Sequence, residues 1–319
     1  MLLFIVTAAT LFVAITNGAN ANFKGVASLY GSGTTSLHRA LAWGTATTFC
    51  GSLAAAVLTS GLLKQFSGRG LVADALVSDP LFVAAVGVGA ACTSLLATRF
   101  GFPVSTTHAL VGALLGAGLA GGGVVQWAAL GRNFVVPLVI SPILAGVLAA
   151  LLWPLLRAIG MAPSGRTPIL DTAHFMSTGA ASFARGLNDA PKMAALLMAA
   201  PEADATVALL TVASAMAVGG LVGGHRVAET LGKRVTAMDP GQGFAASLAT
   251  AGLVTTASLH TLPVSTTHVS VGAMAGIGST TRQAHWRKIG EIAVAWVTTV
   301  PCGALLAAVA WWLIRCAVG

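Results

Sequence analysis

Charged side chains are scarce in this sequence. Only 8% of the 319 residues are Asp, Glu, Lys or Arg, against about a quarter in soluble proteins, whereas 56% are hydrophobic. The mean hydropathy is +0.85. The few charges lie between apolar stretches of roughly 20 residues, a length that crosses a bilayer as a helix. This composition excludes a soluble globular protein and indicates an all-α polytopic membrane protein embedded in the lipid bilayer.

Other absences narrow the class further. The apolar runs are continuous rather than alternating, which argues against a β-barrel. The four cysteines lack paired short spacing, so neither a metal site nor a disulfide is expected from them. No GxxxxGK[ST] string occurs, which disfavours coupling to ATP within this chain. The net charge of +8 comes from Lys and Arg placed singly or in pairs near segment ends, a pattern typical of membrane surfaces rather than of nucleic-acid binding.

The sequence is duplicated. The string Pro-Val-Ser-Thr-Thr-His fills residues 103–108 and again residues 263–268. Asp79-Pro80 and Asp239-Pro240 recur at the same separation, and other features recur at nearly the same one. The chain therefore divides into a first transmembrane repeat over residues 1–158, a linker over 159–171 and a second transmembrane repeat over 172–319.

Each repeat is expected to hold one apolar segment, a polar interruption and then further apolar segments. The first repeat has apolar segments near 2–16, 40–63, 81–98, 104–120 and 134–156, and the second near 172–187, 205–224, 243–259, 264–278 and 289–315. Repeats of this kind are typical of secondary transporters, in which broken or half-helices meet at a site near the bilayer midplane. Whether the repeats are parallel or inverted stays open, because basic residues occupy equivalent loops in both.

The duplicated strings have the chemistry of an oxyanion site. Each follows a proline and precedes a helix of small residues, so its hydroxyls and free backbone amides lie at a helix N-terminus, where the partial charge is positive. Such ends bind oxyanions. The candidate substrate-binding hydroxyls are Ser105, Thr106, Thr107, Ser265, Thr266 and Thr267. The alternative is that they only cap and pack.

The histidines that end the two strings form a secondary pair of candidates. His108 and His268 could donate to a substrate or carry a proton. A structural hydrogen-bonding role is the alternative for both.

A second pair of polar strings covers residues 17–25 and 185–192. A carboxylate is costly inside a membrane, which makes Asp189 a functional candidate paired with a cation. Asparagine oxygens, together with carbonyls freed by helix unwinding, would suit a hard cation such as Na⁺. Lys24 and Lys192 could offset substrate charge, pair with Asp189 or extend to the membrane interface.

Together, these strings resemble the signatures of the inorganic phosphate transporter family of the low-affinity PiT or Pho-4 type, whose relatives include sulfate permeases. The resemblance covers nearly the whole chain. It implies two inverted repeats with phosphate and a coupling cation, Na⁺ or H⁺, between them. Carried over residue by residue, it selects the six hydroxyls above with Asn20 and Asn188 for substrate, and Asn20, Asn188 and Asp189 for the cation.

One position departs from the family pattern. The family has an Asn-Asp pair in both repeats, whereas Asn20 is followed here by Ala21. Natural divergence of coupling, a changed substrate and an engineered substitution all remain open. The departure removes a carboxylate from the place where a cation would be bound or relayed.

The predicted function is secondary active transport of inorganic phosphate coupled to Na⁺ or H⁺. A sulfate permease of the same fold is the alternative, and a passive anion channel is a remote one. An enzyme is not expected, because the Ser and His positions lack the glycines of a nucleophile elbow. No cofactor is expected beyond Na⁺ as a coupling ion, and a homodimer stays open.

The start of the chain bears on its location. It lacks a positively charged lead, so its first apolar segment is interpreted as a transmembrane helix rather than a signal. Together with the absence of a transit peptide, this favours the inner (plasma) membrane of a prokaryote.

Overall fold

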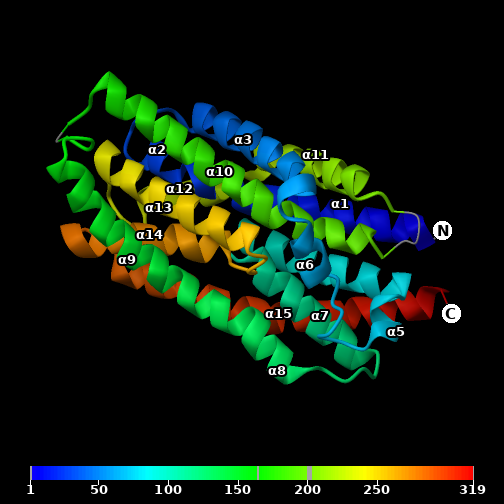
Figure 1. Ribbon diagram of the computed structural model, residues 1–319. Helices are drawn as coiled ribbons and strands as arrows, with labels where there is room; N and C mark the ends of the chain where they lie inside the picture. The colour runs from blue at the N-terminus through cyan, green and yellow to red at the C-terminus, as the bar shows by residue number, and fades with distance from the viewer. Residues whose placement is uncertain (1, 164, 200–202, 319) are drawn as a thin grey trace.

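The computed structural model describes residues 2–163, 165–199 and 203–318 (Figure 1), and that part of the chain is helical without a named strand. The helices of the first repeat are α1 (Leu2–Ala21), a 3-10 turn (Lys24–Val26), α2 (Ala27–Gly31), α3 (Leu37–Leu58), α4 (Ser60–Gln65), α5 (Asp74–Val77), α6 (Pro80–Arg99), α7 (Thr106–Ala120), α8 (Trp127–Leu130), a π-helical turn (Gly131–Val135) and α9 (Val136–Ala158). Those of the second are α10 (Pro168–Leu197), α11 (Ala205–Gly223), α12 (His225–Lys233), α13 (Pro240–Leu259), α14 (Thr266–Thr281) and α15 (Trp286–Val318).

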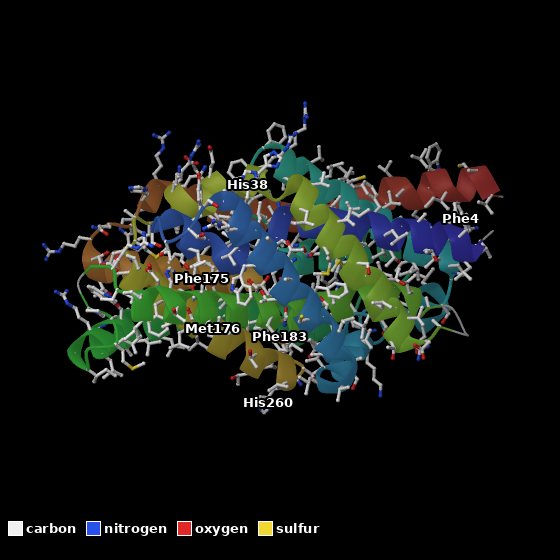
Figure 2. The ribbon with its side chains drawn as sticks, turned by 90° about the horizontal axis from the view of Figure 1, so that it is seen from above. Phe4, His38, Phe175, Met176, Phe183 and His260 are labelled. Atoms are coloured by element: carbon white, nitrogen blue, oxygen red, sulfur yellow. The ribbon has the colours of Figure 1, made fainter. Side chains whose placement is uncertain are left out.

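Six helical stretches among the described residues are long and apolar enough to cross a membrane. They are Leu2–Gly31, Leu37–Leu58, Pro80–Arg99, Trp127–Ala158, Ala205–Gly223 and Trp286–Val318. Large apolar side chains on the outside of the bundle are open to the surroundings, as for Phe4, which is 77% exposed, and Met176 (Figure 2). Polar groups instead concentrate in the interior, the reverse of a soluble protein. The prediction of an all-α polytopic membrane protein is confirmed.

The two repeats cross the bundle in opposite directions. Helix α1 starts beside the N-terminus at the right of Figure 1 and runs left, whereas its counterpart α10 starts at the left and runs right. Both chain ends lie at the right, and the connection from α9 to α10 lies at the left. The repeats are therefore inverted, as the family resemblance implies.

Two half-helices begin inside the bundle. Helix α7, with 15 residues, and α14, with 16, are shorter than the roughly 20 residues that a full crossing needs. The hydroxyls of Ser105 and Ser265 fix the starting points, since each accepts a hydrogen bond at 3.2 Å from a backbone amide of the first turn. In Figure 1, α7 extends to the right and α14 to the left, so their N-termini are directed toward the middle of the molecule.

Glycines hold each half-helix against a long helix. A Cβ added at Gly112 of α7 would lie 2.2 Å from the carbonyl oxygen of Val300 in α15, and one at Gly272 of α14 would lie 2.3 Å from that of Pro142 in α9. Such contact between backbones requires the absence of a side chain, as in other membrane helix pairs. Because α15 belongs to the second repeat and α9 to the first, the half-helices pack across the two repeats.

The second polar string does not interrupt its helix, contrary to expectation. Helix α10 continues through Pro191 to Leu197, whereas α1 ends at Ala21. Pro191 lacks the N–H that would bond the carbonyl of Leu187, and the hydroxyl of Thr59 donates to that carbonyl instead, at 3.0 Å. This replacement donor lets α10 pass the proline, so the expectation of unwinding is wrong for the second repeat.

Candidate functional site

Four buried charged side chains lie between the starts of the two half-helices. Lys24, Arg185, Asp189 and Lys192 are each at most 3% exposed. They are the only Asp, Glu, Lys or Arg side chains that are buried in the described part of the chain. We call them the charged cluster. Charges inside a membrane protein mark functional sites by default, because burying them is costly.

Lys24 belongs to the first repeat but bonds to both. Its ammonium donates to the carbonyl of Val104 at 2.7 Å and to the hydroxyl of Thr267 at 2.5 Å. The same hydroxyl donates to the Val104 carbonyl at 2.8 Å, which closes a triangle of hydrogen bonds. The first turn of α14 is thereby tied to the loop that precedes α7.

Lys192 repeats this arrangement with the roles of the repeats exchanged. Its ammonium donates to the carbonyl of Val264 at 2.9 Å and to the hydroxyl of Thr107 at 2.9 Å. It also donates to Asp189 at 3.0 Å and to Asn188, and it lies 5.5 Å from the centre of the Phe66 ring. Each half of the site therefore joins an ammonium, a carbonyl before one half-helix and a threonine hydroxyl.

Asp189 is shared between two cations. Its Oδ1 accepts from Lys192, and its Oδ2 lies 3.4 Å from the Nε of Arg185. The hydroxyl of Thr266 donates to Oδ2 at 3.3 Å. Both carboxylate oxygens are thus engaged by residues of the chain itself.

Arg185 also spans the repeats. Its guanidinium donates to the side-chain oxygens of Asn17 and Asn22, both at 2.6 Å, and to the hydroxyl of Thr48 at 3.3 Å. Asn17 in turn donates to Thr106 at 2.7 Å. Arg185, Asn17 and Asn22 are not among the site residues predicted from the sequence. An arginine within an otherwise apolar segment was the available signal for the first of them.

The two candidate asparagines, Asn20 and Asn188, form hydrogen bonds within their own repeats. Asn20 donates to Thr98 and to the carbonyl of Phe102, both at 2.9 Å, and accepts from the amide of Val104 at 3.1 Å. Asn188 donates to Ser258 at 2.9 Å. The structure therefore places Asn188 in contact with the charged cluster, through Lys192, and places Asn20 against the loop before α7.

The two histidines face each other between the repeats. Nδ1 of His108 bonds the Trp296 carbonyl and Nδ1 of His268 bonds the Leu138 carbonyl, both at 3.0 Å. Because a carbonyl only accepts, Nδ1 carries the proton in each ring. The ring centres are 4.6 Å apart. Both imidazoles thus bind helices of the opposite half.

The threonines of both strings enter the site, whereas the two serines bond their own helix starts. Ala21 is fully buried at the end of α1, at the position equivalent to Asp189. The two halves of the site therefore share hydroxyls, carbonyls and an ammonium, but differ by one carboxylate.

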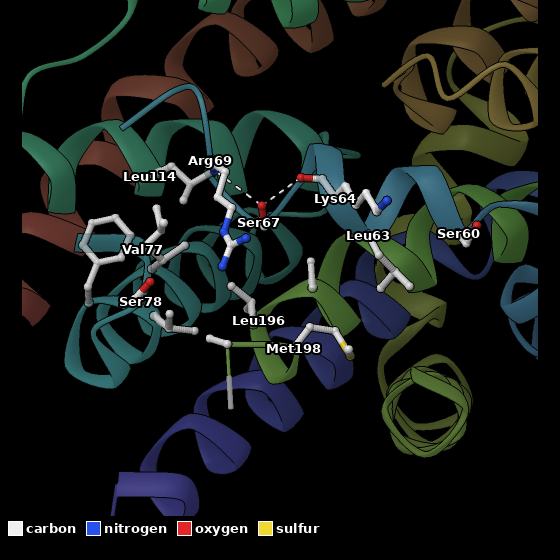
Figure 3. A pocket seen from close by; sticks show the side chains of 15 residues that line it. Ser60, Leu63, Lys64, Ser67, Arg69, Val77, Ser78, Leu114, Leu196 and Met198 are labelled. Carbon is white, nitrogen blue, oxygen red and sulfur yellow. Dashed lines mark hydrogen bonds between the residues drawn. The ribbon is translucent and has the colours of Figure 1, made fainter. Parts of the chain in front are cut away.

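A cavity of about 480 Å³ opens beyond one end of the site (Figure 3). It is lined by Ala195 and Leu196, one turn after Lys192 on α10, and by the basic side chains of Lys64 and Arg69. Figure 3 shows the hydroxyl of Ser67 donating to the carbonyl of Lys64, at 2.8 Å. Positive charge at such an opening attracts anions.

The chain is similar to known proteins over most of its length. A probable low-affinity inorganic phosphate transporter of Rhizobium meliloti is 34% identical over 259 residues, which cover 76% of this chain and 76% of the relative. One of Mycobacterium leprae is 28% identical and covers 98% of this chain and 78% of its own length. A solved structure of "the sodium-dependent phosphate transporter" has the same fold, with a TM-score of 0.87, 22% identity and 99% of each chain covered.

A family model, that of the phosphate transporter family, matches residues 17–168 and again residues 162–307. Each match covers one of the inverted repeats, with its polar strings and its half-helix. The resemblance carried by those strings is confirmed, and the chain belongs to the phosphate transporter family.

Proposed function

We propose that the chain moves inorganic phosphate across the membrane as a secondary active transporter, coupled to the downhill movement of Na⁺ or H⁺. One observation carries this: the N-termini of two half-helices from inverted repeats converge on a buried cluster rich in cations. Helix N-termini, hydroxyls and ammonium groups are all donors, as a tetrahedral anion requires.

The hydrogen bonds between repeats suggest how access alternates. Phosphate that enters between the half-helices would accept hydrogen bonds from Lys24 and Lys192. It would replace the carbonyls and hydroxyls of the chain that accept those bonds now. Loss of those internal bonds would free one repeat to rock against the other around the bound anion. The inverted arrangement allows the same motion toward either side.

A coupling cation would act through Asp189, the one buried carboxylate among the described residues. A proton would neutralise it, and a sodium ion would need its oxygens together with those of Asn20 and Asn188. Lys24, Lys192, His108 and His268 are secondary candidates for contact with the substrate.

Uptake of radiolabelled phosphate into proteoliposomes tests the proposal. We expect saturable uptake that an imposed gradient of Na⁺ or H⁺ drives above the equilibrium level. Flux that stays proportional to concentration and stops at equilibrium would instead identify a passive anion channel.

Sulfate is the second candidate substrate, for one reason. Asp189 already has donors on both oxygens, so the site offers little to accept the proton of hydrogen phosphate, whereas sulfate only needs donors. Competition between labelled phosphate and unlabelled sulfate in the same vesicles separates the two. Equal inhibition constants would mean that the site does not discriminate between the anions.

A further inference from the structure

We infer that resident side-chain cations, and not bound metal ions, supply the positive charge that holds a doubly charged tetrahedral oxyanion in this site. The inference rests on the proposed function and deepens it.

Cations outnumber anions in the charged cluster. Counted in their ordinary ionised forms, the buried Lys24, Arg185 and Lys192 carry three positive charges and Asp189 carries one negative charge, which leaves an excess of two positive charges. No other Asp, Glu, Lys or Arg is buried among the described residues. Nδ1 of His108 and Nδ1 of His268 each donate to a backbone carbonyl, and a neutral imidazole with its proton at Nδ1 suffices for that bond.

 Neutral imidazoles add no charge, so the excess of two stays on the cluster.

The ammonium groups of Lys24 and Lys192 have equivalent surroundings in the two halves of the site. Each lies against a backbone carbonyl and a threonine hydroxyl, which are Val104 and Thr267 for Lys24, and Val264 and Thr107 for Lys192. Carbonyl and hydroxyl oxygens are the ligands that a hard cation would use at such a place. In both halves of the site, an ammonium nitrogen therefore already occupies the place where these oxygens could bind a metal cation.

Both oxygens of the Asp189 carboxylate already have partners in the chain. Lys192 holds Oδ1 of Asp189, while Thr266 and Arg185 hold Oδ2. A sodium ion would have to displace these donors and would add a further positive charge to a cluster that already has an excess. Electrostatics thus disfavours a metal ion and favours an anion.

The ammonium of Lys24 has no negatively charged partner among the described residues. Its ammonium bonds only to neutral oxygens, and no carboxylate of the described residues lies within ion-pair distance of it. Buried charges without a partner are costly, and a bound dianion would relieve that cost. The cluster is therefore matched to hydrogen phosphate or to sulfate, which share charge and shape.

The first test uses the unmodified protein. Its thermal unfolding in detergent is followed with phosphate, sulfate or methanesulfonate, in buffers of sodium chloride or choline chloride. We expect phosphate and sulfate to raise the Tm equally in both buffers, and the singly charged methanesulfonate to leave it unchanged. Stabilisation that needs sodium, or that methanesulfonate matches, would overturn the inference.

The second test uses proteoliposomes under one fixed proton gradient, with sodium or choline on both sides. We expect the same phosphate uptake in both media, and a loss of roughly tenfold or more in the variant Lys24→Gln. Lys233→Gln removes an exposed lysine of α12 and serves as the matched control with unchanged uptake. Saturable uptake that requires sodium contradicts this inference alone, whereas no saturable uptake in any medium contradicts the proposed function itself.

Discussion

Asp189 is a single buried carboxylate that forms ion pairs with two cations, Arg185 and Lys192. Removing its charge in Asp189→Asn leaves those two cations buried without a counter-charge. We expect the free energy of unfolding to fall by about 3–5 kcal/mol, the typical cost of breaking a buried ion pair. The midpoint of thermal unfolding in detergent measures the loss.

The control for that variant is an ion pair at the surface. Glu229 and Arg234 lie 3.5 Å apart with side chains that are 63% and 61% exposed. Glu229→Gln should change the free energy of unfolding by less than about 1 kcal/mol. Equal losses in the two variants would show that Asp189 holds no more than a surface pair does.

Ala21 is the residue at which the two halves of the site differ. Ala21→Asp would restore the carboxylate of the family pattern, and a coupling cation bound to it would leave the positive excess of the cluster unchanged. We expect uptake coupled to a cation gradient to increase, and Ala21→Asn, which is similar in size but neutral, to lack this effect. Unchanged uptake and unchanged cation dependence in the Asp variant would refute the idea.

Residues of the site differ in how far the sequence reveals them. Thr107 and Thr267 could be predicted because their strings are duplicated, and a duplicated polar string in an apolar chain needs a reason. Arg185 could not be ranked, because its partners Asn17 and Asn22 are more than 160 positions away in the sequence. Pairing across such a distance is set by tertiary packing, which local patterns do not encode.

At the scale of the element, the half-helices depend on close contact between backbones. A Cβ at Gly116 of α7 would lie 1.9 Å from the carbonyl oxygen of Ala304 in α15. We expect Gly116→Ala to lower the free energy of unfolding by about 1–3 kcal/mol, as overpacking does, and to reduce uptake by moving the start of α7. Thermal unfolding and uptake measured on the same preparation test both effects.

Gly290 of α15 is the matched control, because nothing lies within 4 Å of a Cβ added there. Alanine favours a helix over glycine by about 0.5–1 kcal/mol, so Gly290→Ala should be neutral or slightly stabilising. A loss as large as that of Gly116→Ala would mean that close contact with α15 does not explain the effect of the Gly116 variant.

Several elements follow from local sequence and others do not. The duplicated Asp79 and Asp239 prove to be N-caps of α6 and α13, each followed by proline at the first helical position. The uninterrupted course of α10 could not be foreseen, since it depends on a hydroxyl that Thr59 brings from another helix. Local signals thus locate helix starts better than they locate helix ends.

At the scale of the whole molecule, basic residues are unevenly distributed. The end that holds the connection between the repeats carries Arg166, Arg226, Lys233, Arg234, Arg282, Arg287 and Lys288, and the opposite end carries Lys64, Arg69, Arg132 and Arg315. Positively charged loops stay on the cytoplasmic side of a membrane. We therefore expect the connection between the repeats to be cytoplasmic and both chain ends to face outward.

Cysteine labelling checks this orientation. In a variant without the four native cysteines, Val124→Cys lies after α7 at the outer end, and Gln283→Cys lies after α14 at the opposite end. An impermeant maleimide should label the first in intact cells and the second only after permeabilisation. The reverse pattern would mean that the molecule is inserted the other way round.

The inverted repeats could be foreseen only through the family resemblance. Charge in the loops did not decide the orientation from sequence, because basic residues occupy equivalent loops in both repeats. The number of crossings in each repeat could not be counted from sequence either. The structure settles the count by placing the starts of α7 and α14 inside the bundle.

The hydrogen bond that Lys24 makes to Thr267, across the repeats, bears on how the chain is made. Its partner Thr267 follows 243 positions later, so during synthesis the first repeat enters the membrane long before that partner exists. An unpartnered lysine at the centre of a membrane helix costs about 2.5–3.5 kcal/mol on insertion scales. Until α14 has been made, Lys24 therefore lacks one of its two oxygen partners, and a chain truncated before α14 leaves this ammonium with the Val104 carbonyl alone.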